Sequence, residues 1–358
     1  MNTTKLHQKA DFSNRNIFVG MDIHKKSWSV SIYCEQDYLR TFTQPPQTEA
    51  LVKLLHRDYP GGTYTCGYEA GLFGFWIQRS LQAQKINCKV IHPSDIPQSG
   101  KRKTIKRDSI DSRGIAQALA LKLVESIYVP DQETERDRTI IRYRHRLQQD
   151  IRRCKNRIQG LLFQFGIEIP ANYRSSWSKK FIVWLKEIEP SLGSAGSTLN
   201  HMIAQLELLR KTLLEVNTNI RSLQKSEKYC RKVELLRSIP GIGALSAITI
   251  LTELADIRRF SNFRQLNSYV GLYPMEFSSG ENDWKGSITV RKNDFLRSLL
   301  IEVAWISVRH DPALTQVFQD WKLRMTAKRA IVKVARKLLS RIRFVLCNEM
   351  YYETGIIK

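Results

Sequence analysis

The chain has 358 residues, of which 42% are hydrophobic, so it is long enough for two or three packed domains and too apolar for a disordered chain. Its 57 lysines and arginines against 34 acidic residues give a net charge of +23, which favours a polyanionic partner over the alternative of a merely soluble basic protein. The six cysteines lack CxxC spacing and no uncharged apolar run approaches the roughly 20 residues of a membrane span, which excludes thioredoxin-like motifs, common zinc sites and a membrane partner, and predicts a cytoplasmic protein.

Residues 1–127 alternate between strand and helix patterns. Residues 17–34 predict two strands joined by a polar turn, and residues 39–43, 63–70 and 87–93 predict further strands. Helical patterns cover residues 48–57, 73–84 and 108–124. This alternation predicts a mixed α/β sheet.

Residues 128–232 carry two heptad seams. The first is broken only by Arg144 and repeats every seven residues, at Ile140, Leu147, Cys154 and Leu161. The second alternates steps of three and four, at Leu199, Met202, Leu206, Leu209, Leu213, Val216, Ile220 and Leu223. Such seams pack as coiled coils within one chain or between two. We expect an antiparallel helical hairpin, with dimerisation favoured over a plain structural spacer.

Residues 233–358 predict a compact helical region. Residues 236–254, 295–308 and 312–346 have helical patterns, and residues 274–294 are rich in Ser, Gly and Asn and predict a loop. Residues 239–243, Ile-Pro-Gly-Ile-Gly, look like the hairpin of a helix-hairpin-helix motif. Gly241 and Gly243 would let backbone amides approach a phosphate, although a tight turn between packed helices explains them equally well.

Four acidic residues stand at positions where their side chains can converge. Asp22 and Glu69 lie at the ends of predicted strands, while Asp108 and Asp111 share one face at a helix start. Taken singly, each is more simply a strand-end charge, a helix cap or a solvated side chain. Clustered carboxylates need cations, and their hard oxygens suit Mg²⁺ or Mn²⁺, which support phosphoryl transfer.

Basic residues flank this acidic set and form two further runs. Candidates for phosphate contacts beside the acids are Lys101, Arg102, Lys103, Lys106 and Arg107. Residues 136–157 contain nine Lys and Arg against two acids, and residues 322–343 contain nine and no acid. A solvated helix face is the usual explanation of one such run, but two with this imbalance favour nucleic acid.

The acidic residues resemble the DEDD tetrad in the RuvC-like domain of IS110-family insertion-sequence transposases. These relatives of Piv-type DNA invertases include the bridge-RNA-guided recombinases. The family commonly has a Lys-Thr-Asp-x-x-Asp-Ala run, where this chain has Lys-Arg-Asp-Ser-Ile-Asp-Ser at residues 106–112. Both aspartates match, while Arg107 and Ser112 depart from the commonest form.

A second resemblance lies downstream. Residues 271–280, Gly-Leu-Tyr-Pro-Met-Glu-Phe-Ser-Ser-Gly, resemble the signature of the family's C-terminal domain, in which the serine before the glycine is the nucleophile. On that match Ser279, rather than its neighbour Ser278, is catalytic. Residues 286–300 resemble the family's Gly-x-Ile-x-Lys-Arg-Gly-Asn-x-x-Leu-Arg stretch. Arg291 and Lys292 match its basic pair, and Asn293 stands at the usual glycine, where it tolerates a left-handed turn.

The resemblance implies a DNA transposase with a RuvC-like, RNase H-like α/β domain at 1–127, a coiled-coil middle at 128–232 and a helical serine domain at 233–358. It implies a divalent metal, DNA and a guide RNA as partners, a phosphoserine intermediate, a dimer or tetramer, and action at the bacterial nucleoid. Two alternatives remain: a structure-selective nuclease that uses the tetrad and water, like a junction resolvase, and a non-enzymatic nucleic-acid-binding protein.

Overall fold

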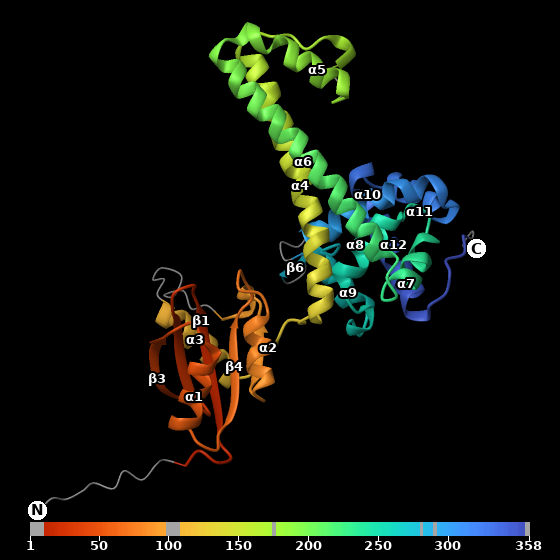
Figure 1. Ribbon diagram of the computed structural model, residues 1–358. Helices are drawn as coiled ribbons and strands as arrows, with labels where there is room; N and C mark the ends of the chain where they lie inside the picture. Colours follow the sequence, from red (N-terminus) through yellow and green to blue (C-terminus); the bar gives the residue numbers. More distant parts are fainter. Residues whose placement is uncertain (1–10, 98–107, 174–176, 280–281, 289–291, 355–358) are drawn as a thin grey trace, which may run out of the picture. The chain divides into compact units, whose positions relative to one another are not determined.

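The computed structural model describes residues 11–97, 108–173, 177–279, 282–288 and 292–354, with the backbone alone from 274 to 288. The chain divides into two units, Met1–Val129 and Pro130–Lys358 (Figure 1). Each unit encloses its own buried apolar clusters. We therefore describe the two units one after the other.

A five-stranded mixed sheet forms the centre of the first unit, as the sequence predicts. Its spatial order is β3-β2-β1-β4-β5, in which β1 is antiparallel to β2 and parallel to β4. The remaining neighbours pair antiparallel in β2–β3 and parallel in β4–β5. The strands are β1 Asn16–Ile23, β2 Trp28–Cys34, β3 Asp37–Gln44, β4 Thr63–Glu69 and β5 Asn87–Ile91, and the helices are α1 Thr48–Asp58, α2 Trp76–Ala83 and α3 Asp108–Ala120.

The two faces of this sheet are covered differently. On β1, Ile17, Val19 and Met21 are fully buried in a cluster that includes apolar residues of α1 and α2. Because side chains alternate along a strand, Phe18, Gly20 and Asp22 point to the opposite face, which α3 covers. The metal-binding candidates on β1 and α3 therefore share one side of the sheet.

A long helical pair begins the second unit. Helix α4 (Gln132–Gln164) lies beside α6 (Ser194–Gln224), with α5 (Lys179–Ile188) near their far end (Figure 1). Cys154 contacts the carbonyl of Met202, whereas Arg144, earlier in α4, donates a hydrogen bond to Asn217, later in α6. The two helices are thus antiparallel, as predicted. Arg144, which interrupts the first seam, is accommodated by this polar partner across the pair.

The rest of the second unit is mainly helical. It contains α7 Cys230–Arg237, α8 Ala244–Leu254, α9 Phe263–Val270, α10 Asp294–His310, α11 Pro312–Lys322 and α12 Ala327–Asn348. Short 3-10 turns occur in this unit at Ala171–Tyr173, Glu189–Leu192 and Ile257–Arg259, and in the first unit at Pro93–Asp95. The single helix predicted at 312–346 is wrong, because Thr326 leaves helical geometry (φ −62°, ψ 149°) and begins α12 anew.

The loop predicted at 274–294 is also wrong. An antiparallel strand pair lies there, formed by β6 (Pro274–Ser279) and β7 (Asn282–Ile288). The content of Ser, Gly and Asn indicated a loop, but Met-Glu-Phe-Ser at 275–278 also alternates apolar and polar residues, which is the period of a strand. The predicted nucleophile Ser279 is the last residue of β6.

Candidate active site

Two of the predicted acids lie at the ends of neighbouring parallel strands. The ladder between β1 and β4 runs to the pair Met21–Tyr68, and Asp22 and Glu69 each come one residue later. Residues at equal register in parallel strands point to the same face. The carboxyl ends of adjacent parallel strands are a common place for ligands in open α/β sheets.

A pair of glycines allows α3 to approach these strand ends. Gly20 of β1 is paired with Gly67 of β4 in the ladder. A Cβ atom on Gly20 would lie 2.1 Å from the carbonyl oxygen of Ser112 and 2.3 Å from the amide of Ala116, both backbone atoms of α3. A Cβ on Gly67 would lie 2.8 Å from Leu119. Because Gly20 and Gly67 lack side chains, α3 can pack directly on them, and we call this contact surface the seat of α3. The first turn of α3 carries Asp108 and Asp111.

Buried hydroxyl groups complete this seat. The Ser112 hydroxyl is fully buried and lies 3.1 Å from the Oγ of Ser29 and 2.9 Å from the Oγ of Ser31, both on β2. The Ser31 hydroxyl also shares a hydrogen bond with the hydroxyl of Thr41 on β3. These partners explain how the chain tolerates a serine where the resembling family commonly has alanine, since a buried hydroxyl needs a hydrogen bond.

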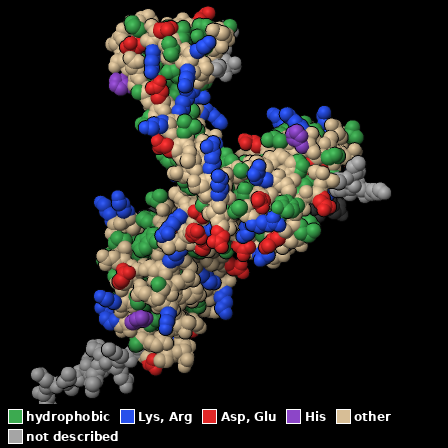
Figure 2. All heavy atoms as spheres, turned by 45° about the vertical axis from the view of Figure 1, so that its right-hand side comes forward, with side chains coloured by type: hydrophobic (Ala, Val, Ile, Leu, Met, Phe, Trp, Pro, Cys, Tyr) green, Lys and Arg blue, Asp and Glu red, His purple; other side chains and the backbone are tan. Residues whose placement is uncertain are grey.

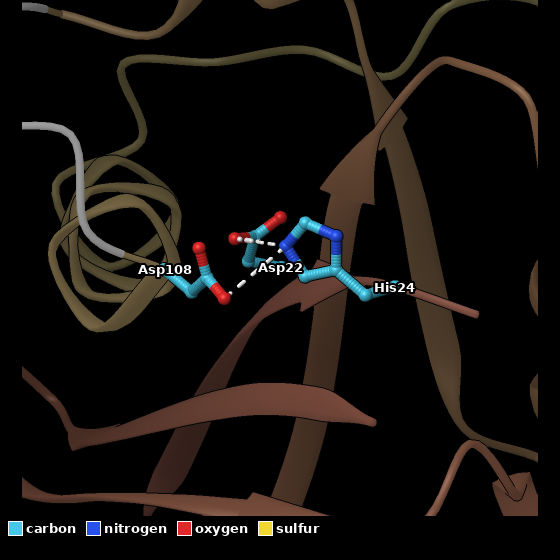
Figure 3. A group of neighbouring side chains, drawn as sticks. All are labelled: Asp22, His24 and Asp108. Carbon is cyan, nitrogen blue, oxygen red and sulfur yellow. Dashed lines mark hydrogen bonds and ion pairs between the residues drawn. The ribbon is translucent and has the colours of Figure 1, made fainter. Parts of the chain in front are cut away.

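The structure brings Asp22 and Asp108 together around a histidine (Figure 3). The Nε2 atom of His24 lies 3.1 Å from Oδ2 of Asp22 and 3.4 Å from Oδ2 of Asp108. The three potential ligand atoms all lie within 4.8 Å of one another. The sequence interpretation missed His24, although its position two residues after Asp22 places it on the same side of the extended chain.

Electrostatics at this group favour a cation. Burial raises the pKa of Asp22, and the negative charges of Asp108 and Asp111 add to the increase, while the His24 side chain opposes it. A positive ion between the carboxylates would relieve both the burial cost and the repulsion. Carboxylate oxygens suit Mg²⁺ and Mn²⁺, and an imidazole nitrogen is better matched to Mn²⁺ than to Mg²⁺. The donor set therefore fits a divalent metal.

The other two predicted acids stand beside this group. Asp111 is half-buried in the first turn of α3, near enough for its charge to act on Asp22. Glu69 is exposed at the end of β4. Among the described residues, the group with ligand atoms within 4.8 Å consists of Asp22, His24 and Asp108, without Asp111 or Glu69. The four-carboxylate tetrad stays a prediction.

Most of the remaining predicted site residues lie outside the described residues, and two others, Lys292 and Asn293, are described. The side chain of Ser279 lies outside the described residues, as do Arg291 and the basic candidates Lys101, Arg102, Lys103, Lys106 and Arg107. Lys292 is described, and its Nζ lies 3.1 Å from Asp294. The left-handed turn expected at Asn293 is wrong, because this residue has φ −88° and caps the N-terminus of α10.

The two glycines of the predicted phosphate hairpin differ in their surroundings. Gly241 has φ +93° and lies against α10, where a Cβ would come within 3.0 Å of the backbone amide of Ser307. Packing and backbone geometry thus account for this glycine. Gly243 is exposed at the start of α8 and has no atom within 4 Å of its Cβ position. Phosphate binding here remains a prediction.

Comparisons with known proteins match both halves of the chain. A family model described as "Transposase IS116/IS110/IS902 family" matches residues 233–319, and a second model, for the DEDD domain of IS110 transposases and described as "Transposase", matches residues 19–167. The putative transposase y4rJ of Sinorhizobium fredii is 32% identical over 299 residues, which cover 76% of this chain and 74% of the relative. The chain belongs to the IS110 family of transposases.

Other relatives extend this similarity along nearly the whole chain. The putative transposase y4qE of Sinorhizobium fredii is 26% identical over 340 residues, covering 92% of this chain and 82% of the relative. The transposase of insertion sequence element IS1111A from Coxiella burnetii is 25% identical over 284 residues, covering 77% of this chain and 76% of the relative. The IS110 transposase described here is accordingly a DNA strand-transfer enzyme whose DEDD domain implies metal-dependent catalysis.

One further property concerns membranes. Within the described residues of this transposase, no helix combines the length and the apolar character that crossing a bilayer requires.

Proposed function

We propose that this transposase cuts and rejoins DNA with Ser279 as the nucleophile and a divalent metal held at Asp22 and Asp108, at sites that a guide RNA selects. The observation that supports the metal part most directly is the convergence of Asp22, His24 and Asp108 at the end of β1. Glu69 and Asp111 complete the proposed tetrad, since they follow the neighbouring strand end and the first helical turn.

The metal would stabilise negative charge that develops on the scissile phosphate. Asp22 and Asp108 provide oxygens to hold it, and the seat of α3 on Gly20 and Gly67 fixes the distance between strand and helix. The RNase H-like class of the first unit is part of this proposal, and the mixed five-stranded sheet is consistent with it.

The covalent step belongs to Ser279. Its Oγ would lose its proton and form a bond to phosphorus while the bond from phosphorus to one ester oxygen of the DNA breaks, and the departing oxygen would end with the proton that Oγ lost. Reversal with a different strand end would release the serine and rejoin the DNA. The match of residues 233–319 to the family model supports this assignment, because that stretch contains Ser279.

Guide-RNA binding and oligomerisation complete the proposal. Lys and Arg side chains line the visible face of the rod formed by α4 and α6 (Figure 2), and the exposed basic residues of α4 include Arg136, Arg146, Arg152, Arg153 and Arg157. A second basic face lies on α12, with Lys328, Arg329 and Lys337 exposed. Two separate basic faces support binding of more than one nucleic-acid segment, by this chain or by a dimer or tetramer of it.

A covalent trap tests the serine and the metal separately. Full-length protein is incubated with guide RNA and end-labelled element DNA, with Mg²⁺ or Mn²⁺ or with a chelator, and resolved on denaturing gels. We expect a labelled protein band that is lost in Ser279→Ala, kept in Ser278→Ala, and lost on chelation or in Asp22→Ala. Full recombination by Ser279→Ala would remove the serine from the mechanism. Hydrolysed ends without an adduct would support the nuclease instead.

A further inference from the structure

A fully buried carboxylate lies at the base of the segment that carries Ser279. Glu253, near the end of α8, has no exposed side-chain surface. Arg142 of α4 donates two hydrogen bonds to it, from Nε to Oε1 at 2.7 Å and from Nη2 to Oε2 at 2.8 Å. The side-chain amide of Asn293 donates a third to Oε2 at 2.8 Å. The carboxylate is thus held by a guanidinium and an amide at once.

Asn293 connects this carboxylate to the two ends of the strand pair. Its backbone N–H donates to the carbonyl of Tyr269 at 3.1 Å, joining the residues that precede β6 and follow β7. Its side-chain oxygen accepts the N–H of Leu296 and caps α10. The Tyr269 hydroxyl donates to the backbone carbonyl of Glu253 at 3.0 Å. Both ends of the segment are therefore fastened to one buried residue.

Close packing also holds together the two ends of the segment that contains β6 and β7, and we call this contact between the ends the closure. Gly271 follows α9 with φ +81°, and a Cβ there would lie 2.4 Å from the Cβ of Lys292. The chain thus leaves α9 and returns to α10 with its two ends in contact. A second cation of α4, Arg138, also acts on Glu253, and its side chain donates to the carbonyl of Thr252 at 2.9 Å.

We propose that Glu253 and Asn293 are positioning residues for Ser279: they close the base of the β6–β7 segment and fix it to α4. The inference rests on the proposed role of Ser279 as the nucleophile. The Glu253 carboxylate is fully buried and the Arg142 side chain is 46% exposed, and the two parallel hydrogen bonds between them specify one arrangement. Here the arrangement specified is that of the strand ends.

Electrostatics agree with an ionised Glu253. Burial alone would raise the pKa of this carboxyl, but the hydrogen bonds and charge of Arg142, together with the amide of Asn293, hold the pKa below its ordinary value. An ionised carboxylate accepts hydrogen bonds from both partners at once, which the closure requires.

The test separates the closure from general stability. Asn293→Ser retains an oxygen that caps α10 but lacks the amide that binds Glu253, and Asn293→Asp also retains the cap while placing a second carboxylate against Glu253. Asn262→Ser is the matched control, because Asn262 caps α9 in the same way and, among the described residues, its amide donates to the neighbouring Ser261. Glu253→Gln, which keeps the shape and removes the charge, is a further variant.

Three quantities are measured for each full-length variant: the thermal midpoint, hydrogen exchange in peptides that span Tyr269 and Asn293, and the rate of covalent adduct formation at saturating DNA. We expect Asn293→Ser to raise exchange about tenfold and to slow adduct formation between about tenfold and a hundredfold, because small misplacements of reacting groups have effects of that size. Asn293→Asp should show a larger effect. DNA affinity should match that of Asn262→Ser. The thermal midpoint should fall below that of Asn262→Ser, because the buried Glu253 carboxylate loses one hydrogen bond, and it should stay above the assay temperature, so that adduct formation reports on folded protein.

The outcomes are decisive whether or not the serine forms an adduct. Wild-type exchange in Asn293→Ser would refute the closure, and raised exchange with a wild-type adduct rate would refute its link to Ser279. If the wild-type protein cuts DNA without any adduct, the nucleophile proposal fails, and exchange alone then decides whether Asn293 closes the segment. If Glu253→Gln does not fold, the two Asn293 variants still give the answer.

Discussion

At the scale of single residues, the absence of side chains at Gly20 and Gly67 decides how closely α3 approaches the sheet. We expect Gly20→Ala to displace α3, because the new Cβ would overlap backbone atoms that cannot rotate away, at a cost of about 1–3 kcal/mol or more. Hydrogen exchange in α3 should rise and metal-dependent DNA cleavage should fall sharply.

The matched control is Gly160→Ala in α4, where a Cβ meets no atom within 4 Å. This change should stabilise the protein by about 0.5–1 kcal/mol, since alanine favours a helix. A Gly20→Ala protein with normal exchange and cleavage would show that α3 does not depend on this seat.

The hydroxyl groups under α3 provide a second residue-scale prediction. Ser112→Ala should cost about 1–2 kcal/mol, because it leaves the buried hydroxyl of Ser29 without this partner, and Ser29→Ala should cost less, because Ser112 keeps its contact with Ser31. The double variant should cost less than the sum by about 0.5 kcal/mol or more, since the second change removes the unpaired group. Urea unfolding of all four proteins measures this coupling. Strict additivity would argue against the hydrogen bond, and exposed Ser109→Ala is the neutral control.

At the scale of elements, the start of α4 depends on one carboxylate. Partial burial opposes ionisation of Asp131, but hydrogen bonds from Thr134 and Lys228 outweigh it and lower its pKa from 3.8 to about 2. Because the folded pKa is depressed, this stabilisation is present above the unfolded value and is lost as the pH falls through about 2.

We expect Asp131→Asn to keep the helix cap but to lose this pH dependence. The free energy of unfolding of the second unit, measured between about pH 5 and pH 2, should fall less with decreasing pH in the variant than in the wild type. Asp150→Asn is the control, since Asp150 is exposed in the middle of α4 and pairs only with Arg153 among the contacts described. Equal pH profiles for all three proteins would contradict the role of Asp131.

Most elements could be predicted from the sequence because their periodicity is local. The five strands of the sheet and the long helices α4 and α6 carry periodic patterns, interrupted in α4 only at Arg144, and the structure confirms these elements. The β6–β7 pair was missed because Ser, Gly and Asn suit both turns and strand ends, and the break before α12 because Thr326 interrupts no apolar stripe.

The candidate site, too, could be predicted only in part from the sequence. Asp22 and Asp108 could be predicted because strand ends and helix starts are visible in the sequence. His24 was missed, although its place two residues after Asp22 was visible in the sequence. Its contact with Asp108 could not be predicted, since that contact depends on where α3 lies, and thus on the Gly20–Gly67 pairing between residues 47 positions apart. The Glu253–Asn293 contact was likewise beyond reach, because it joins a helix end to a cap through the interior.

At the scale of the whole molecule, the net charge of +23 governs nucleic-acid affinity. We expect the affinity for DNA to fall by roughly 10³- to 10⁵-fold between about 50 and 200 mM salt, as for proteins that neutralise 6–10 phosphates. Lys328→Gln and Lys337→Gln on α12 should each reduce the slope of log affinity against log salt by about 0.9. The control is Lys53→Gln on α1, which lies outside the basic runs. A flat salt profile would contradict electrostatic binding.

The division of the chain at residues 129 and 130 has a consequence for synthesis on the ribosome. Every strand of the first sheet is encoded before the boundary, so we expect this unit to fold while the remainder is still being translated. The second unit must wait, because Arg142 in its first helix meets its carboxylate partner only when residue 253 has emerged. A premature stop codon before residue 253 would thus leave a folded first unit joined to a helix whose Arg142 lacks its carboxylate partner.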